Sequence, residues 1–347
     1  MKKTAIGRWV VCERESSPEL RQDPLTGLWV IISPNRSHRP IERETSPLSV
    51  EKKECPFCPG NESQTPPEID AFREKNSLPD QPGWHVRVVP NKYPALNETS
   101  QILKSQNLLY NSIPGDGVHE VVIETPDHNS ELFSLQVSEL VSILKVFSRR
   151  LQQIRKNRKL KYALIFKNAG RKAGASLNHP HSQIIATPVL PTKAKIEIQK
   201  LKQYYRNNKS CLYCDVIKSE KRQGARVVAE SDEFIAYTPF ASRFPFETWV
   251  ISQRHVSRFE MESEDRLHNF AMMLKRVMTK LNRAVGLDAY NFLIHTAPLV
   301  AKNDHYFHWH AEILPMMTSV AGFERGAGFY INEIFPELAA QKIREAN

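Results

Sequence analysis

Two stretches of this chain, HPHSQIIATP (residues 179–188) and HWHAEILP (residues 308–315), have the same plan. Each begins with two histidines one residue apart, continues into a short apolar run and ends at a proline. Short apolar runs that contain β-branched residues are typical of strands. Because the plan occurs twice in one chain, it predicts a fold built from two repeats.

The duplication extends to the segments that precede these stretches. In each half a CxxC pair comes first, two apolar segments follow, and a third apolar segment precedes the paired histidines. The first half contains CPFC (55–58), WHVRVVPNKYPAL (84–96), HEVVIETPDH (119–128) and YALIFKNAG (162–170), and the second contains CLYC (211–214), FIAYTPFASRFPF (234–246), TWVISQRHVSRF (248–259) and YNFLIHTAP (290–298). The repeated order predicts an α+β fold of two tandem repeats, each a mainly antiparallel sheet with a packed helix.

One long amphipathic segment in each half predicts the packed helix. VSELVSILKVFSRRLQQI (137–154) has apolar residues at steps of three and four, and Ser130 or Ser134 is the expected N-cap. Its counterpart, SEDRLHNFAMMLKRVMTKLNRAVG (263–286), ends at a glycine, the residue that most often terminates a helix. A last helix is expected from Pro336 onward.

Length and composition indicate a globular protein with two domains. The chain has 347 residues, of which 25% are charged and 41% hydrophobic, which excludes a disordered class. We expect the domains at residues 1–190 and 191–347, with residues 188–210 as the connection. No window approaches the eighteen or so apolar residues of a transmembrane helix. The start MKKTAI imitates a signal peptide, but charged residues soon follow it, so we expect no secretion signal and a cytoplasmic protein.

The formal net charge of +10 favours an anionic partner, either a phosphorylated small molecule or a nucleic acid. The densest basic run, RRLQQIRKNRKLK (149–161), lies at the expected end of a helix, where cations interact favourably with the helix dipole. No aromatic-basic pattern of RNA-binding modules accompanies it. We therefore expect a small phosphorylated ligand, with no nucleic acid and no membrane as partners.

Four of the five cysteines form the two CxxC pairs, and Cys12 stands alone. In a reducing compartment such pairs are metal ligands or redox motifs. A thioredoxin-like pair lies at the start of a helix after a strand, whereas CPFC (55–58) precedes PGNESQTPPE (59–68), which reads as a loop. The sequence therefore favours metal binding.

Histidines complete a four-ligand set in each half. His128 and His255 each end a strand segment and are 127 residues apart, while His179 and His308, the first histidines of the HxH motifs, are 129 residues apart. Two thiolates and two imidazoles form the closed tetrahedral set that structural zinc requires. The sequence thus predicts two zinc sites per chain, one made by Cys55, Cys58, His128 and His179, the other by Cys211, Cys214, His255 and His308.

The HPH tract on its own allows two ligands, two bases, or one of each. If His179 binds zinc, His181 remains free, and a neutral imidazole held in one tautomer by a backbone carbonyl of this stretch is a competent nucleophile toward phosphorus. The counterpart in the second half is His310. Gln183 follows His181 by two residues and can donate to a phosphoryl oxygen, whereas Glu312, in the same place after His310, would repel it. His181 is therefore the expected nucleophile, and Gln183 its expected catalytic neighbour.

With these residues identified, the chain resembles the galactose-1-phosphate uridylyltransferases of the histidine-triad superfamily over nearly its whole length. The family motifs occur in the family order: DPLTGLWVIISPNRSHRP (23–40), CPFCPGN (55–61), RVVPNKYPAL (87–96), ETPDH (124–128), FKNAG (166–170), SLNHPHSQ (176–183), FPFE (244–247), IHTAP (294–298) and HWHAEILP (308–315). The resemblance implies a ping-pong transfer. His181 attacks the α-phosphorus of UDP-glucose, releases glucose 1-phosphate and holds the uridylyl group until a hexose 1-phosphate, typically galactose 1-phosphate, accepts it.

The resemblance also implies the roles of the binding residues and a homodimer whose sites are completed across the interface. Gln183 and Ser176 match positions that donate to the phosphates, Asn168 one near the nucleotide, and Asn91, followed by Tyr93, one beside the uridine. Arg36 and Arg39 match arginines whose planar donor forks suit phosphate contacts.

The second metal site departs from well-known bacterial members, in which a glutamate and three histidines hold the metal. The second CxxC pair makes the Cys2His2 set the expected one, for zinc or another metal such as iron, and leaves His295 and Glu197 spare. This pattern resembles the branch that includes the plant ADP-glucose phosphorylases.

Two alternatives to the uridylyltransferase follow. One is an adenylyl-transferring relative that uses ADP-glucose or a dinucleotide, with phosphate or sulfate as acceptor. The other is a zinc-stabilised nucleotide- or nucleic-acid-binding module without turnover. HPHSQ (179–183) argues against the binding module, because binding alone needs no free histidine between a zinc ligand and an amide donor.

Overall fold

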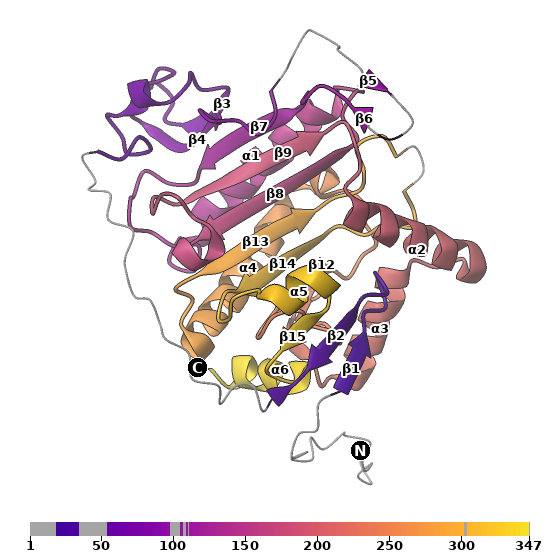
Figure 1. Ribbon diagram of the computed structural model, residues 1–347. Coiled ribbons are helices and arrows are strands. Elements are labelled where there is room, and N and C mark those ends of the chain that lie inside the picture. Colours follow the sequence, from indigo (N-terminus) through magenta and orange to yellow (C-terminus); the bar gives the residue numbers. More distant parts are fainter. Residues whose placement is uncertain are drawn as a thin grey trace.

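The computed structural model describes residues 19–34, 54–97, 105–106, 109, 111–301 and 304–346. Its centre is an antiparallel sheet of ten strands (Figure 1). The strand order is β10 (Val227–Glu230), β11 (Phe234–Tyr237), β12 (Thr248–Ser252), β14 (His310–Pro315), β13 (Tyr290–His295), β8 (Tyr162–Ala169), β9 (His181–Thr187), β7 (Val118–Ile123), β4 (Trp84–Pro90) and β3 (Asp70–Arg73). A second sheet contains β1 (Glu19–Gln22), β2 (Trp29–Ile32) and β15 (Tyr330–Asn332), and β5 (Ser105–Gln106) pairs with β6 (Asn111–Ser112).

The large sheet is symmetrical about its centre, where β8 pairs with β13. The first half of the chain supplies β3, β4, β7, β9 and β8, and the second half supplies β10, β11, β12, β14 and β13 in the matching places. The two central strands pair over six residues, from Tyr290 opposite Ala169 to His295 opposite Leu164. The expectation of two α+β repeats is confirmed. The domain division at residue 190 stays a prediction.

Two long helices cover one face of the sheet and pack against each other; both lie behind the sheet in Figure 1. They are α1 (Val137–Arg155) and α4 (Glu264–Val285). As expected, α4 begins after Ser263, whose side chain accepts from the Arg266 N–H, and ends at Gly286 with a φ of 67°. Their apolar faces form the main core together with alternate residues of the strands.

The expected cap of α1 is wrong. The helix begins after Gln136, whose backbone N–H donates to Oε2 of Glu139 at 2.7 Å, one half of a capping box. Ser134 instead donates to the Glu131 carbonyl in the preceding turn, and Ser130 donates to Asp127. Both serines are therefore occupied by local turns before the helix starts.

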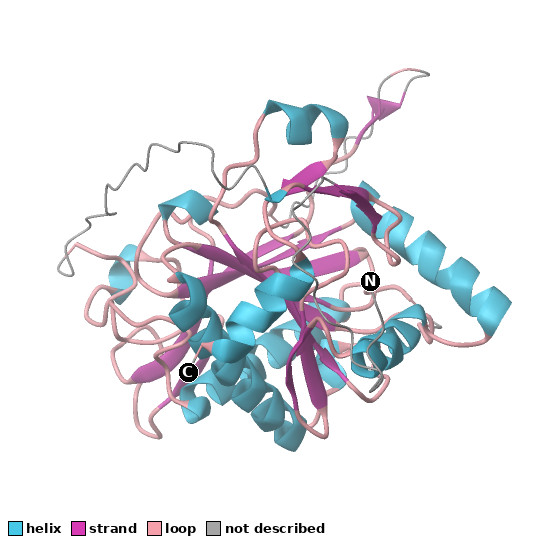
Figure 2. Ribbon diagram, turned by 90° about the horizontal axis from the view of Figure 1, so that it is seen from below, coloured by secondary structure: helices cyan, strands magenta, loops and turns pink. Residues whose placement is uncertain are grey.

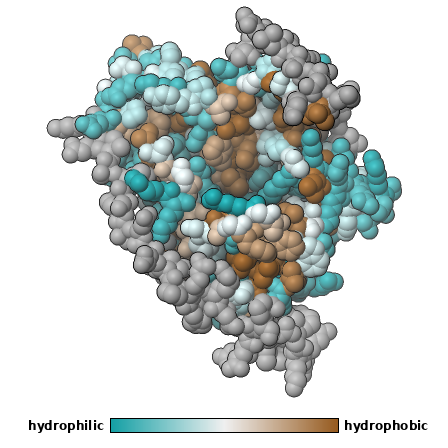
Figure 3. Space-filling model, in the orientation of Figure 1, coloured by the Kyte–Doolittle hydropathy of each residue, from teal (hydrophilic) through white to brown (hydrophobic). Residues whose placement is uncertain are grey.

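The opposite face of the sheet is covered differently in the two halves (Figures 1 and 2). Over the second half lie α2 (Thr192–Asn208) and α3 (Leu212–Gln223), with the loop of β1 and β2 packed beside them. Over the first half, half-buried side chains such as Phe166 of β8 and Ile185 of β9 remain on the sheet, and Figure 3 shows an apolar patch over these strands. Among the described residues, no α-helix covers the first half of the sheet on this face.

The chain closes with α5 (Gly322–Ala327) and the expected last helix, α6 (Pro336–Glu345). Short 3-10 turns lie at Glu62–Gln64, Arg171–Ala173 and Phe259–Met261. Among the described residues, no helix has the length and apolar composition that crossing a bilayer requires.

Candidate active site and metal centres

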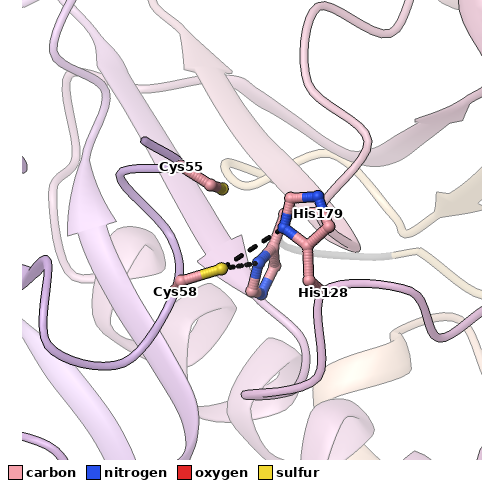
Figure 4. Close-up of side chains that lie close together, drawn as sticks. All are labelled: Cys55, Cys58, His128 and His179. Carbon is pink, nitrogen blue, oxygen red and sulfur yellow. Dashed lines mark hydrogen bonds between the residues drawn. The ribbon is translucent and has the colours of Figure 1, made fainter. Parts of the chain in front are cut away.

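The first Cys2His2 set is assembled at one end of the sheet (Figure 4). Cys55 and Cys58 lie in the loop before β3, His128 follows β7, and His179 lies two residues before the start of β9. Sγ of Cys58 lies 3.3 Å from Nδ1 of His128 and 3.5 Å from Nδ1 of His179. All four ligand atoms lie within 4.8 Å of one another, and all four residues are buried.

These distances fit a tetrahedral metal ion. With Zn–S bonds of about 2.3 Å and Zn–N bonds of about 2.0–2.1 Å, tetrahedral geometry separates sulfur from nitrogen by about 3.6 Å. Nε2 of His179 donates to the carbonyl of Thr125 at 2.8 Å, which leaves the lone pair on Nδ1, the atom that faces Cys58. Burial lowers the pKa of His179 to about 4, so its ring is neutral as a metal ligand must be.

The second set has the same geometry in the second half. Cys211 precedes α3 and Cys214 lies in its first turn, with Sγ of Cys214 3.4 Å from Nδ1 of His255 and 3.6 Å from Nδ1 of His308. The hydrogen bond from Cys214, together with bonds from the two histidines, lowers the pKa of the Cys211 thiol. The second set differs from the first in burial, because Cys214 and His255 are only half-buried. In addition, Nε2 of His308 is buried and has no hydrogen-bond partner among the described residues.

A third group, His295, His310 and Glu312, lies beside the second set. The ring of His310 is stacked between Trp249 and His295, each with its centroid 4.8 Å away. Glu312 accepts from Arg243 at 2.6 Å and borders a cavity of about 270 Å³. His310 therefore lies between two aromatic rings, with Nε2 3.8 Å from a carboxylate oxygen of Glu312.

His181 begins β9 with its ring fixed in one orientation. Its Nδ1 donates to the carbonyl of His179 at 2.8 Å, the kind of backbone partner that the sequence analysis expected from this stretch. The lone pair therefore lies on Nε2. Burial lowers the pKa of His181, so the ring is neutral, and the ring of Phe57 packs against it at 5.2 Å. His181 and Asn168 both line a cavity of about 240 Å³ at this end of the sheet.

The remaining predicted binding residues divide into three groups. Gln183 and Asn91 lie together, with Nδ2 of Asn91 3.4 Å from Oε1 of Gln183. Asn168 lies at the cavity and accepts from Asn291 at 2.7 Å, while Ser176 is exposed on the loop before His179 and is not among the residues that line this cavity. Arg36 and Arg39 lie outside the described residues.

Two features near His181 were missed by the sequence analysis. Behind β9, on the helix-covered face, the buried pair Lys167 and Glu124 forms a 2.7 Å ion pair, and Glu124 also accepts from Ser182 at 2.5 Å. On the open face, His119 lies 2.7 Å from Gln183. The sequence signal that could have indicated these residues was their place in the motifs: Lys167 precedes Asn168 in FKNAG (166–170), and His119 opens HEVVIET (119–125).

Two models of one protein family together match almost the entire chain. The family described as galactose-1-phosphate uridyl transferase, N-terminal domain, matches residues 9–191, and the corresponding C-terminal domain matches residues 197–345.

Individual relatives carry two different names. The chain is 37% identical to the ADP-glucose phosphorylase of Arabidopsis thaliana over 339 residues, which cover 95% of this chain and 93% of that protein. It is 32% identical to the galactose-1-phosphate uridylyltransferase of Thermotoga maritima, over 94% of this chain and 98% of that one. Among solved structures, the Arabidopsis thaliana ADP-glucose phosphorylase with bound ADP-glucose has a TM-score of 0.81 at 36% identity, covering 95% of this chain and all of that one. A uridylyltransferase has a TM-score of 0.73 at 30% identity, covering 94% and 98%.

Proposed function

The chain belongs to the galactose-1-phosphate uridyl transferase family, and we propose that it transfers a nucleotidyl group between sugar phosphates through a covalent intermediate on His181. The observation that carries this proposal is the hydrogen bond from Nδ1 of His181 to the His179 carbonyl, because it leaves the Nε2 lone pair for attack. A module that only bound nucleotides would have no need of a neutral histidine held in this tautomer beside a polar cavity.

In the first step Nε2 of His181 attacks the α-phosphorus of a nucleoside diphosphate hexose. The N–P bond forms, the bond from phosphorus to the bridging oxygen breaks, and hexose 1-phosphate leaves with the electron pair. The ring becomes cationic, and the His179 carbonyl, which accepts from Nδ1, stabilises that charge. In the second step a phosphate oxygen of the acceptor attacks phosphorus, the N–P bond breaks, and His181 returns to the neutral form.

The groups around His181 have complementary roles in the proposal. Gln183 donates its amide N–H to a phosphoryl oxygen, and Ser176 and Asn168 contact the phosphates and nucleotide. Asn91 lies beside the base. Arg36 and Arg39 neutralise phosphate charge. Support for these assignments comes from the family motifs, from the contact between Gln183 and Asn91, and from the cavity shared by His181 and Asn168.

We further propose that both Cys2His2 sets hold zinc, with another metal as the alternative in the second set. Each set offers two sulfurs and two nitrogens and has no open position, so the metal supplies structure and takes no part in the chemistry. In the first set, metal held by His179 would anchor the start of β9 and so the carbonyl that orients His181.

Two donors remain candidates, and a different observation favours each. UDP-glucose, with galactose 1-phosphate as acceptor, follows from the family itself and from the name of the Thermotoga maritima relative. ADP-glucose, with phosphate as acceptor, is favoured by the second CxxC pair and by the higher identity and TM-score of the Arabidopsis thaliana relative.

A cytoplasmic homodimer completes the proposal. The open face of β8 and β9 carries apolar side chains, and a second copy packed there would cover them and complete the site (Figure 3). Sedimentation analysis at micromolar concentration should give twice the chain mass, and a monomer would contradict the dimer.

One experiment tests the function directly. The protein is incubated separately with UDP-glucose and ADP-glucose, and its intact mass is measured. We expect a uridylyl or an adenylyl adduct that is absent from His181→Ala, and the donor that gives the adduct identifies the nucleotide. No adduct with either donor, from protein that binds nucleotide, would support a binding module instead.

A further inference from the structure

His119 lies on β7 and Gln183 on the neighbouring strand β9, and both side chains are on the open face. The register of the two strands sets Val121 directly opposite Gln183, so His119, two residues before Val121, shares their face. Nε2 of His119 lies 2.7 Å from Oε1 of Gln183. On the other side of the ring, the backbone N–H of Ala95 donates to Nδ1 of His119 at 3.0 Å.

The Ala95 contact determines which nitrogen of His119 carries the proton. A backbone N–H can only donate, so Nδ1 of His119 is the acceptor and holds the lone pair. The neutral ring then carries its proton on Nε2, which donates to Oε1 of Gln183. The oxygen of Gln183 is thereby held toward His119, and its amide N–H groups remain available on the face that carries His181.

We propose that His119 is a positioning residue that fixes the orientation of the Gln183 amide for phosphoryl transfer. The inference rests on the proposed function, in which Gln183 donates to a phosphoryl oxygen. A glutamine amide can turn by half a rotation at small steric cost, and the turned amide would present its carbonyl oxygen to the phosphate. In this protein that rotation would also set the amide nitrogen of Gln183 against the Nε2–H of His119. The turned amide is therefore disfavoured both by the phosphate and by His119.

Asn91 strengthens the same orientation. Its Oδ1 accepts from the Tyr93 N–H at 2.8 Å, which fixes its own amide. Its Nδ2 lies 3.0 Å from Nε2 of His119 and 3.4 Å from Oε1 of Gln183. Since His119 Nε2 is itself a donor, the hydrogen bond of Asn91 goes to Gln183, and two donors converge on one oxygen.

The arrangement joins two parts of the site that are distant in sequence. Asn91 and Ala95 belong to the segment after β4, which the proposed function sets beside the nucleotide base, whereas Gln183 serves the phosphate. The ring of His119 connects them, because its two nitrogens bond one partner on each side.

The test measures the rate of adduct formation on His181 after rapid quenching, by intact mass, with UDP-glucose and ADP-glucose in separate reactions. The variants are His119→Phe, His119→Gln, Gln183→Ala and the double variant His119→Phe with Gln183→Ala. His268→Phe, on an exposed histidine of α4, is the matched control. Metal content and thermal unfolding are measured for every variant.

We expect His119→Phe to slow adduct formation about tenfold or more, and Gln183→Ala about a hundredfold, the usual loss of one transition-state donor. The double variant should be no slower than Gln183→Ala, because His119 acts only through that amide. His119→Gln, whose amide nitrogen can donate from about the place of Nε2, should recover much of the rate. The control should react like the wild type.

Three results would overturn the inference. They are a wild-type rate in His119→Phe, a double variant slowed by the product of the two single effects, or equal losses in His119→Phe and His119→Gln. The last two would mean that His119 supports the fold rather than the amide. A wild-type protein that forms no adduct overturns the proposed function itself, and this inference with it.

Discussion

The main-chain oxygen of His179 accepts a hydrogen bond from Nδ1 of His181 at 2.8 Å, while the ring of His179 faces Cys58. The two histidine rings thus have different surroundings. The ring of His179 lies in a Cys2His2 set that could hold a metal ion, and the ring of His181 borders a cavity. Substitutions that remove one ring at a time should therefore have separable effects.

Removing the ring of His179 should disturb the metal and the fold together. In His179→Ala the first set keeps three ligands, so we expect about one metal ion per chain instead of two and a clearly lower melting temperature, because metal binding contributes to the free energy of folding. Adduct formation should fall as well. Metal analysis by mass spectrometry and thermal unfolding test this; two tightly bound ions in the variant would contradict the ligand assignment.

Removing the ring of His181 should abolish the chemistry and leave the fold. In His181→Gly we expect no covalent nucleotidyl adduct, with metal content equal to that of the wild type, since the side chain touches no metal ligand except through the His179 carbonyl. Intact mass and metal analysis give both answers from one preparation. An adduct in this variant would show that another residue is the nucleophile.

Metal removal should proceed in two phases. Cys214 of the second set is half-buried, whereas all four residues of the first set are buried, so a chelator should extract the second metal first. Cys214→Ser should eliminate the faster phase and leave the slower one. A fast phase that persists in this variant would reverse the order of the two sites.

The buried ion pair of Lys167 and Glu124 behind β9 should be costly to break from one side. Lys167 and Glu124 are almost completely buried and lie 2.7 Å apart, so Lys167→Met leaves an uncompensated buried carboxylate and should lower the free energy of unfolding by about 3–5 kcal/mol. Adding Glu124→Gln should recover part of that loss. Urea unfolding measures both variants, and additive losses would show that the two charges do not compensate each other.

Stability should depend on pH through Glu337, which binds Arg21 and Arg226 between β1, β10 and α6. Burial alone would raise the pKa of Glu337, but the two guanidinium groups outweigh it and hold the pKa below its ordinary value. Its stabilisation is therefore complete above the unfolded pKa of about 4.3 and is lost as the pH falls through the folded pKa.

In Glu337→Gln the deficit in unfolding free energy should be largest near neutral pH and should shrink as the pH falls below about 4. Urea unfolding of the wild type and the variant at several pH values measures the difference. A deficit that stays constant across that range would mean that the carboxylate charge contributes nothing.

The duplicated fold could be predicted because its signals are local and occur twice. The CxxC pairs, the strand-end histidines and the HxH motifs each keep their order, so every ligand of one set predicts its counterpart, such as His308 from His179. The strand order then follows the same symmetry. The cap of α1 was missed because serines such as Ser134 bond within their own turns, a competition that composition does not reveal.

The contacts around β9 were harder to predict, because they depend on which strands become neighbours. His119 reaches Gln183 only because β9 lies between β7 and β8, and Lys167 meets Glu124 across that same strand. In the sequence His119 is simply one member of an alternating strand. Its role depends on a register between segments more than sixty residues apart.

The six-residue pairing of β8 with β13 makes each half of this chain the edge partner of the other. Separation of the halves would expose two rows of backbone donors and acceptors at the middle of the sheet, ready to pair with any similar strand. A half-chain is therefore expected to aggregate, or to assemble with a copy of itself into the arrangement that the intact chain achieves with its other half. The single chain thus resembles a dimer of two similar halves joined by a linker. Both halves have a Cys2His2 set, but in the second half the second histidine of the HxH motif, His310, lies between two aromatic rings.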